Sequence, residues 1–413
     1  MNDPYTMHTL DNGLRIVIEQ MPDVQSAAAG FLVRTGSRDE TAELAGVSHF
    51  LEHMMFKGTP KRTWRDITVD FDSLGSTYNA YTSEDRTVYF GWVRRKDIVK
   101  QMELLADMLR SALPADEFEM EKKVILEEIA MSRDRIEHVA IDFLRSKVFA
   151  GHPLEWPVLG YDDTVGNMAR DAMWSYFQRQ YAANNLTLVV AGRVDPHEII
   201  GHAEALCGAW EASDPPNGRT RPEIRGGVDV FQTGRFKQQV LCLTFPSVGA
   251  ADELAETASA LTTILGGDNS RFFWKIVQAG LSPEAGAHHF AFTDCGLMLL
   301  YGTCQPENAE KLVEAIRREA KLISAERVED REIDHVRIRR RTALAIESES
   351  PYHRLGQIMD DVVFRGAPRT VEQMLAEVDA VTVETIASYF DGFPINGEGH
   401  LSSTGPRQWP QQP

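Results

Sequence analysis

A stretch rich in proline, glycine and charge divides the chain into two halves. Residues 211–227 read EASDPPNGRTRPEIRGG, a composition typical of a linker. At 413 residues the chain also exceeds the size at which one hydrophobic core stops growing, so two or more domains are expected. The sequence therefore predicts an N-terminal domain over 1–212, a linker over 213–227 and a C-terminal domain over 228–413.

Strand and helix patterns follow the same order in both halves. In the first half, strand-like runs around an Asn12-Gly13 turn signal precede a helix, the strand pair STYNAYTSEDRTVYFGWV and an amphipathic helix. The second half repeats strand, helix, strand pair and helix between QQVLCLTFPSV and residue 323. A long charged helix is predicted over 115–148. Because strands and helices mix without strict alternation, we expect an α+β fold of two similar domains, each a mostly antiparallel sheet packed against helices.

Composition excludes several classes of partner. The formal net charge of -18 argues against nucleic acid, whose phosphates are bound by basic patches, and suits basic peptides. No apolar run approaches the roughly 20 residues of a membrane-spanning helix, so no membrane partner is expected. The N-terminus lacks the basic start and apolar stretch of a signal peptide, which predicts a cytoplasmic protein. Four widely spaced cysteines predict reduced, buried thiols.

Residues 46–60, GVSHFLEHMMFKGTP, place two histidines and a glutamate in one apolar run. On a helix over 44–56, His49, Glu52, His53 and Phe56 fall within an arc of roughly 100°. The opposite side carries the apolar residues. They are Leu44, Val47, Leu51, Met54 and Met55.

This polar face has the pattern of a catalytic zinc site. Histidines at i and i+4 lie one turn apart, where two imidazoles can hold one Zn2+, and Glu52 can reach a water on that metal. A lone histidine is more often a surface or satisfied core residue, but a trio on the face away from the apolar stripe is not explained that way. The pattern H-x-x-E-H is the inverzincin signature.

A catalytic zinc needs a third protein ligand. The predicted helix DEFEMEKKVILEEIAMSRDRIEH offers Glu121 and Glu128, seven residues apart and therefore on one face, but Glu127 is not excluded by geometry. A purely structural zinc is less expected because such sites usually use four Cys or His ligands.

Taken together, these residues resemble the pitrilysin and insulin-degrading enzyme family of zinc peptidases, most closely the short subunits similar to mitochondrial processing peptidase. His53 and Glu128 are separated by 74 residues, a spacing typical of that family. The resemblance implies one Zn2+ per chain, bound by His49, His53 and Glu128. It also implies that Glu52 is the catalytic base and that Glu121 is an accessory glutamate.

The resemblance also implies a substrate site. In that family Asn79 and Ala80 would lie on an edge strand beside the zinc, where an extended peptide adds as another strand. Asp85 stands where relatives often have a glutamate that orients a ligand. The expected activity is that of a zinc metalloendopeptidase acting on unfolded or oligopeptide substrates.

One segment departs from the family pattern. Active relatives carry an Arg and a Tyr that grip the substrate, whereas residues 269–286 here place Ile276 or Val277 at the Arg position and Pro283 at the Tyr position. An aliphatic side chain donates no hydrogen bond, and proline lacks a backbone N–H. The resemblance therefore implies a heterodimer whose homologous partner supplies this pair. A homodimer is the rival, and a non-catalytic assembly subunit is a further alternative.

Overall fold

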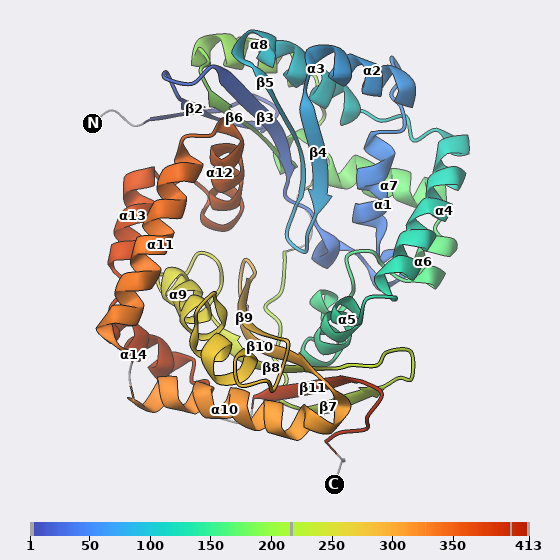
Figure 1. Ribbon diagram of the computed structural model, residues 1–413. Helices are drawn as coiled ribbons and strands as arrows, with labels where there is room; N and C mark the ends of the chain where they lie inside the picture. The colour runs from blue at the N-terminus through green and yellow to red at the C-terminus, as the bar shows by residue number, and fades with distance from the viewer. Residues whose placement is uncertain (1–3, 215–217, 327, 397–398, 411–413) are drawn as a thin grey trace. The chain divides into compact units, whose positions relative to one another are not determined.

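The computed structural model describes residues 4–214, 218–326, 328–396 and 399–410 (Figure 1). Contacts divide the chain into two compact units, each built from three segments and described separately. Unit 1 comprises Met1–Ala130, Trp156–Thr220 and Ala345–Thr370. Unit 2 comprises Met131–Glu155, Arg221–Leu344 and Val371–Pro413.

Unit 1 is built on a six-stranded sheet of order β1-β2-β6-β3-β5-β4. Its neighbours pair antiparallel except β2 and β6, which are parallel. The predicted turn at Asn12-Gly13 is confirmed, since it joins β1 and β2 and Gly13 has φ of +88°. The strands are β1 Tyr5–Thr9, β2 Arg15–Gln20, β3 Ser26–Val33, β4 Thr77–Thr82, β5 Thr87–Arg94 and β6 Leu186–Gly192.

Unit 2 repeats this sheet without the first strand. Its order, β7-β11-β8-β10-β9, matches β2-β6-β3-β5-β4 position by position, and the parallel pair β7 and β11 again stands at the same end. The predicted two similar, mostly antiparallel α+β domains are therefore confirmed. The strands are β7 Gly227–Gln232, β8 Gln239–Ser247, β9 Glu284–Ala291, β10 Gly296–Cys304 and β11 His400–Gly405.

Helices cover both faces of the first sheet, which explains why strand β3 is buried along almost its whole length. Alternate side chains of β3 contribute to two separate apolar clusters, one beneath α1 to α4 and the other beneath α12. Figure 1 shows α3 and α12 on opposite sides of this sheet. The helices of this unit are α1 Val47–Met55, α2 Trp64–Leu74, α3 Ile98–Met108, α4 Ala115–Ser132, α6 Asp162–Gly166, α7 Arg170–Gln180, α8 Pro196–Cys207 and α12 Pro351–Arg365.

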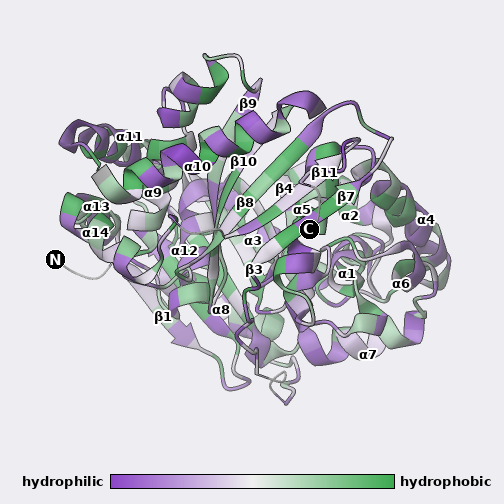
Figure 2. Cartoon of the chain, turned by 90° about the horizontal axis from the view of Figure 1, so that it is seen from below, coloured by the Kyte–Doolittle hydropathy of each residue, from purple (hydrophilic) through white to green (hydrophobic). Residues whose placement is uncertain are grey.

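The second sheet is covered in the same way, by α9, α10 and α14 on one face and by α5 on the other. Helix α10 carries both hydrophobic and hydrophilic residues (Figure 2), as expected for a helix with one buried side. The helices are α5 Ile136–Val148, α9 Ala255–Gly266, α10 Ala309–Glu326, α11 Asp330–Ser348, α13 Val371–Asp379 and α14 Val383–Gly392.

Two predicted helices have different bounds. The single helix over 115–148 is wrong, because α4 ends at Ser132 and α5 begins at Ile136. Buried residues of α4 enter the core of unit 1, whereas those of α5 enter the core of unit 2, and one straight helix cannot face both. The helix over 44–56 begins only at Val47, because Gly46 has φ of +94°, outside the helical region.

Helices α5 and α12 are exchanged relative to chain order. The predicted division places a linker at 213–227, of which residues 215–217 lie outside the described residues. Contacts nevertheless group α5, from the first half of the chain, with the second sheet, and α12, from the second half, with the first sheet. Within the described residues no helix is long and apolar enough to cross a bilayer. All four cysteines are buried and free, as predicted.

The exchange of α12 gives a stability prediction. Ile358 is fully buried between α12 and the first sheet, so Ile358→Ala should lower the free energy of unfolding by about 2–5 kcal/mol. Ile346, which is 66% exposed, provides the control, and Ile346→Ala should change it by less than about 0.5 kcal/mol. Urea unfolding measures both, and equal losses would contradict a core role for α12.

Candidate metal centre

Helix α1 is oriented by its apolar face. Because that face is sealed in the core of unit 1, the helix presents His49, Glu52 and His53 on its other side, as predicted. Leu44 lies outside the helix and is only half-buried, whereas Phe50 joins the core. The fully buried apolar residues of α1 are Val47, Phe50, Leu51, Met54 and Met55.

A carboxylate from outside the helix caps its N-terminus. The two oxygens of Glu40 accept hydrogen bonds from the Gly46 and Ser48 N–H groups, each at 2.7 Å. Burial raises the pKa of Glu40 to about 8, although the hydrogen bonds from Ser48 and Gly46 act in the opposite direction. The sequence analysis missed Glu40, because it precedes the helix by several residues and fits no capping pattern.

Helix α4 packs against α1 through stacked aromatic rings. The ring centroids of Phe50 and Phe118 are 4.7 Å apart, at an interplanar angle of 14°. Residues three, seven and ten positions after Phe118 share its side of α4, which therefore turns Glu121, Ile125 and Glu128 toward α1. The predicted shared face of Glu121 and Glu128 is thus present in the structure.

Three side chains converge between these helices. Glu128 Oε2 lies 3.8 Å from His49 Nε2 and 3.7 Å from His53 Nε2, and one ligand atom from each residue lies within 4.8 Å of the others. A tetrahedral site with metal–ligand distances near 2.1 Å separates its ligands by roughly 3.4 Å, so these residues fit Zn2+. Glu127 is exposed and outside this group, and the geometry favours Glu128.

Glu121 orients one of the histidines. Its Oε1 lies 2.7 Å from His53 Nδ1, which leaves His53 Nε2 directed toward Glu128, and its Oε2 lies 2.5 Å from Lys57 Nζ. Burial raises the pKa of Glu121, but the hydrogen bonds from His53 and Lys57 outweigh it and hold the pKa below its ordinary value. Although burial lowers the pKa of His53, the hydrogen bond to Glu121 and the charge of Glu128 raise it overall.

His49 is an uncharged imidazole. Burial, reinforced by neighbouring His53, lowers its pKa to about 3. Its Nδ1 atom is buried and has no hydrogen-bond partner among the described residues. The neutral form is the one that binds a metal, because a protonated imidazole has no free lone pair.

Glu52 connects α1, the helix that carries both histidines, to the end of strand β4. The Thr82 hydroxyl donates a 2.6 Å hydrogen bond to Glu52 Oε2, which restrains the carboxylate beside the histidines. Burial raises the pKa of Glu52, although the hydrogen bond from Thr82 opposes this shift. The sequence analysis missed both Thr82 and Lys57, which no short pattern connects to the motif.

Strand β4 is the last strand of its sheet, so one edge of it carries no neighbouring strand among the described residues. Asn79 is exposed there and Ala80 is buried. The Ala80 N–H donates to the side-chain oxygen of Asn79 at 2.9 Å, so it is not engaged with β5. The predicted edge-strand position of both residues is present, and their contact with a substrate stays a prediction.

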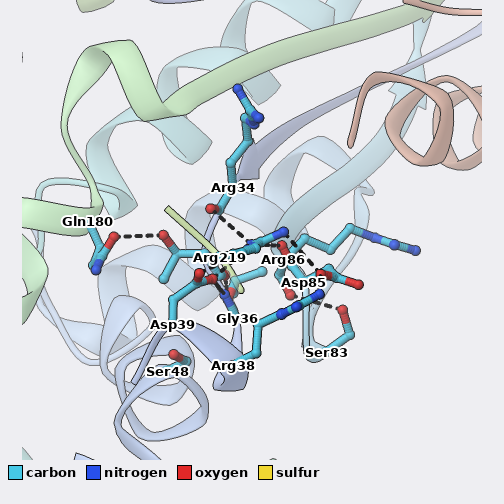
Figure 3. Close-up of polar contacts among 12 residues, drawn as sticks. Arg34, Gly36, Arg38, Asp39, Ser48, Ser83, Asp85, Arg86, Gln180 and Arg219 are labelled. Carbon is cyan, nitrogen blue, oxygen red and sulfur yellow. Dashed lines mark hydrogen bonds and ion pairs between the residues drawn. The ribbon is translucent and has the colours of Figure 1, made fainter. Parts of the chain in front are cut away.

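Asp85 lies in an ion-pair cluster rather than at the histidines. Its Oδ1 atom lies 3.0 Å from Arg38 Nη1 and 3.0 Å from Arg219 Nη1 (Figure 3). Arg219 also donates to the Asp85 carbonyl and to Asp39. The cluster anchors the turn that follows Thr82, whereas the carboxylate hydrogen-bonded to His53 Nδ1 is that of Glu121. A ligand-orienting role for Asp85 stays a prediction.

Family models match most of the chain. The model described as Insulinase (peptidase family M16) matches residues 15–162, and the model described as Peptidase M16 inactive domain matches residues 167–339. The chain belongs to peptidase family M16. The first match contains His49, His53 and Glu128. The second covers most of the half in which the sequence predicts no metal ligands.

Curated M16 relatives are similar over nearly the full length. A Streptomyces coelicolor protein named as an uncharacterized zinc protease is 31% identical over 395 residues, covering 92% of this chain and 84% of the relative. A Bacillus subtilis protein with the same description is 29% identical over 382 residues, covering 92% and 93%.

Solved structures share the fold. A protease from Helicobacter pylori superposes with a TM-score of 0.89 at 20% identity, covering 97% of this chain and 98% of the other. A Pseudomonas fluorescens structure described as a peptidase M16 inactive domain gives 0.86 at 16% identity, covering 98% of both chains.

The converging group separates the two candidate glutamates. Glu128→Ala removes one of three ligands and should weaken zinc binding by more than the 10–100-fold that loss of an outer partner typically causes. Glu127→Ala, one residue away on the exposed side of α4, should leave zinc content unchanged. Elemental analysis after dialysis against a weak chelator measures both, and loss of zinc only from the Glu127 variant would reverse the assignment.

Proposed function

We propose that this chain is a zinc-dependent endopeptidase that cleaves unfolded or oligopeptide substrates. The observation that carries the proposal is the convergence of His49, His53 and Glu128, with Glu52 on the same helix face and a free strand edge beside it. Descriptions of the M16 relatives as zinc proteases support it.

The metal would be held by His49 Nε2, His53 Nε2 and Glu128. When bound, Zn2+ supplies a Lewis acid that polarises the scissile carbonyl and acidifies water. Glu121 keeps the His53 ring in the orientation that binding requires, because it holds Nδ1. A structural zinc site would be expected to use four Cys or His ligands, which this group does not provide.

Glu52 acts as the general base. Thr82 occupies its Oε2 atom, so Oε1 takes a proton from the attacking water and then delivers it to the amide nitrogen as the carbon–nitrogen bond breaks. An extended peptide pairs with the free edge of β4 near Asn79 and Ala80, so main-chain hydrogen bonds supply much of the affinity. Such binding tolerates many sequences.

Glu52→Gln tests this role. The amide keeps the shape of the side chain but cannot accept the proton. Peptide cleavage should therefore fall by about 10²–10⁴-fold or more, the contribution typical of general-base catalysis, while zinc content stays unchanged. The control is Glu127→Gln, on the exposed side of α4. A zinc-replete Glu52→Gln enzyme that cleaves normally would refute the assignment, and absence of zinc from the purified parent would favour a non-catalytic assembly subunit.

The substrate-gripping pair is proposed to come from a homologous partner subunit. Ile276 is buried within the segment Phe273–Val277, and Pro283 is exposed but has no N–H to donate. Neither residue supplies the hydrogen bonds that an Arg and a Tyr would give. The active form is therefore a heterodimer, and a homodimer is the alternative that must be tested against it.

Peptide cleavage by the chain alone and with a homologous subunit that carries the Arg and the Tyr distinguishes the two assemblies. The mixture should be at least about tenfold more active, since each lost substrate hydrogen bond typically costs about 1 kcal/mol or more. A partner whose Arg and Tyr are both replaced is the control. Full activity of the chain alone would contradict the heterodimer.

A further inference from the structure

A small cavity adjoins the free edge of the first sheet, on the face covered by α12. Its volume is about 210 Å3. Pockets for drug-sized ligands measure about 300–1,000 Å3, so this cavity suits a single side chain. Lining residues come from β4, β5 and α12, and include Tyr81, Phe90, Tyr352, Gly356, Met359 and Asp360.

The cavity and α1 lie on opposite faces of β4. Thr82 faces α1, since its hydroxyl contacts Glu52, and Ala80 is buried in the same core as α1. Tyr81, between them, faces the other way, with its ring centroid 6.3 Å from that of Phe90 in the cluster beneath α12. A peptide added to the free edge would continue this alternation and direct every second side chain to the α12 face.

Aromatic rings form the walls of the cavity. Tyr81 and Tyr352 are each 36% exposed, although both contact the buried ring of Phe90. Phe90 and Met359 are buried beneath them, and the Tyr352 ring centroid lies 5.7 Å from that of Phe90. Insertion of a large apolar side chain between these rings would bury both that side chain and the rings away from water.

The charges at the cavity are mutually neutralised. Arg86 Nη2 lies 2.5 Å from Asp360 Oδ1, and the Arg86 guanidinium also lies 5.7 Å from the Tyr81 ring centroid. Arg86 Nε donates to the Tyr81 hydroxyl at 3.3 Å, which holds this wall in place. Because Arg86 and Asp360 neutralise each other, neither is a free counter-ion for a charged substrate side chain, which would lose hydration on entry.

We propose that this cavity is a substrate subsite that accepts one large apolar or aromatic side chain of the extended peptide. The inference rests on the proposed peptidase function and deepens it by naming the substrate class. Strand pairing at β4 supplies affinity without selecting sequence, and the cavity adds selection at one position. Peptides with Phe, Tyr, Leu or Met at a fixed distance from the cleaved bond are therefore preferred.

Gly356 allows the cavity to be filled without disturbing the fold. A Cβ added at Gly356 meets no atom within 4 Å, and the residue lies inside α12. Gly356→Leu should therefore occupy the cavity and leave the melting temperature no lower than that of the parent. Gly201, in α8, also has open space around an added Cβ and is exposed, so Gly201→Leu is the matched control.

The experiment maps cleavage sites in a peptide library by mass spectrometry, with the chain alone or with its partner subunit, whichever is active. The parent and Gly201→Leu should show enrichment of large apolar residues at one position. Gly356→Leu should reduce that enrichment by at least about tenfold, the lower end of what burial of one large apolar side chain supplies. No enrichment in the parent, or enrichment unchanged in Gly356→Leu, would overturn the subsite.

A binding measurement separates failure of the subsite from failure of the peptidase function. Fluorescent peptides that differ only by Phe or Ala are titrated against the Glu52→Gln background, which needs no turnover. Tighter binding of the Phe peptide that Gly356→Leu abolishes and Gly201→Leu retains would support the subsite even without cleavage. Equal binding of both peptides would refute the subsite, while cleavage by the parent would leave the peptidase function standing.

Discussion

The geometry of the candidate metal centre depends on burial of the apolar side of α1. Five of its nine residues are large apolar side chains packed against the first sheet and α4, which fixes the rotation of the helix about its axis. That rotation turns the face that carries His49, Glu52 and His53 toward α4. Stacking of Phe50 on Phe118 then places α4 so that Glu121 and Glu128 meet the histidines. Packing of the apolar residues thus sets the positions of the two helices, and the polar side chains meet on the faces that remain outside the core.

Several carboxylates share this small region, and each is stabilised differently. Glu121 lies between His53 and Lys57, Glu52 accepts from Thr82, and Glu40 accepts from the first N–H groups of α1. Glu128 faces two imidazole nitrogens and remains partly exposed. Buried carboxylates are costly unless they are paired or hydrogen-bonded, so this arrangement leaves Glu128 as the one directed to the metal position.

The two sheets share one arrangement of strands and covering helices. Their strand orders correspond, and each sheet is covered on its second face by a helix from the other half of the chain. In the first unit this helix, α12, also forms one side of the cavity beside β4. The exchange therefore places α12, a segment from the second half of the chain, next to β4, the strand proposed to pair with the substrate. The order of elements along the chain does not predict this position.

Residue patterns along the chain predicted the α+β class, the repeated order of strands and helices, and the H-x-x-E-H helix with its two faces. These follow from local periodicity, which depends only on neighbouring residues. Helix geometry alone left Glu127 open beside Glu128, and the family resemblance selected Glu128. Periodicity did not show that α1 begins after Gly46 and that α4 stops at Ser132. It also gave no sign that Glu40, Thr82 and Lys57 lie at the site. Those depend on which distant surfaces meet. Only the packing of α4 on α1, and of α5 and α12 on sheets outside their own half, decided them.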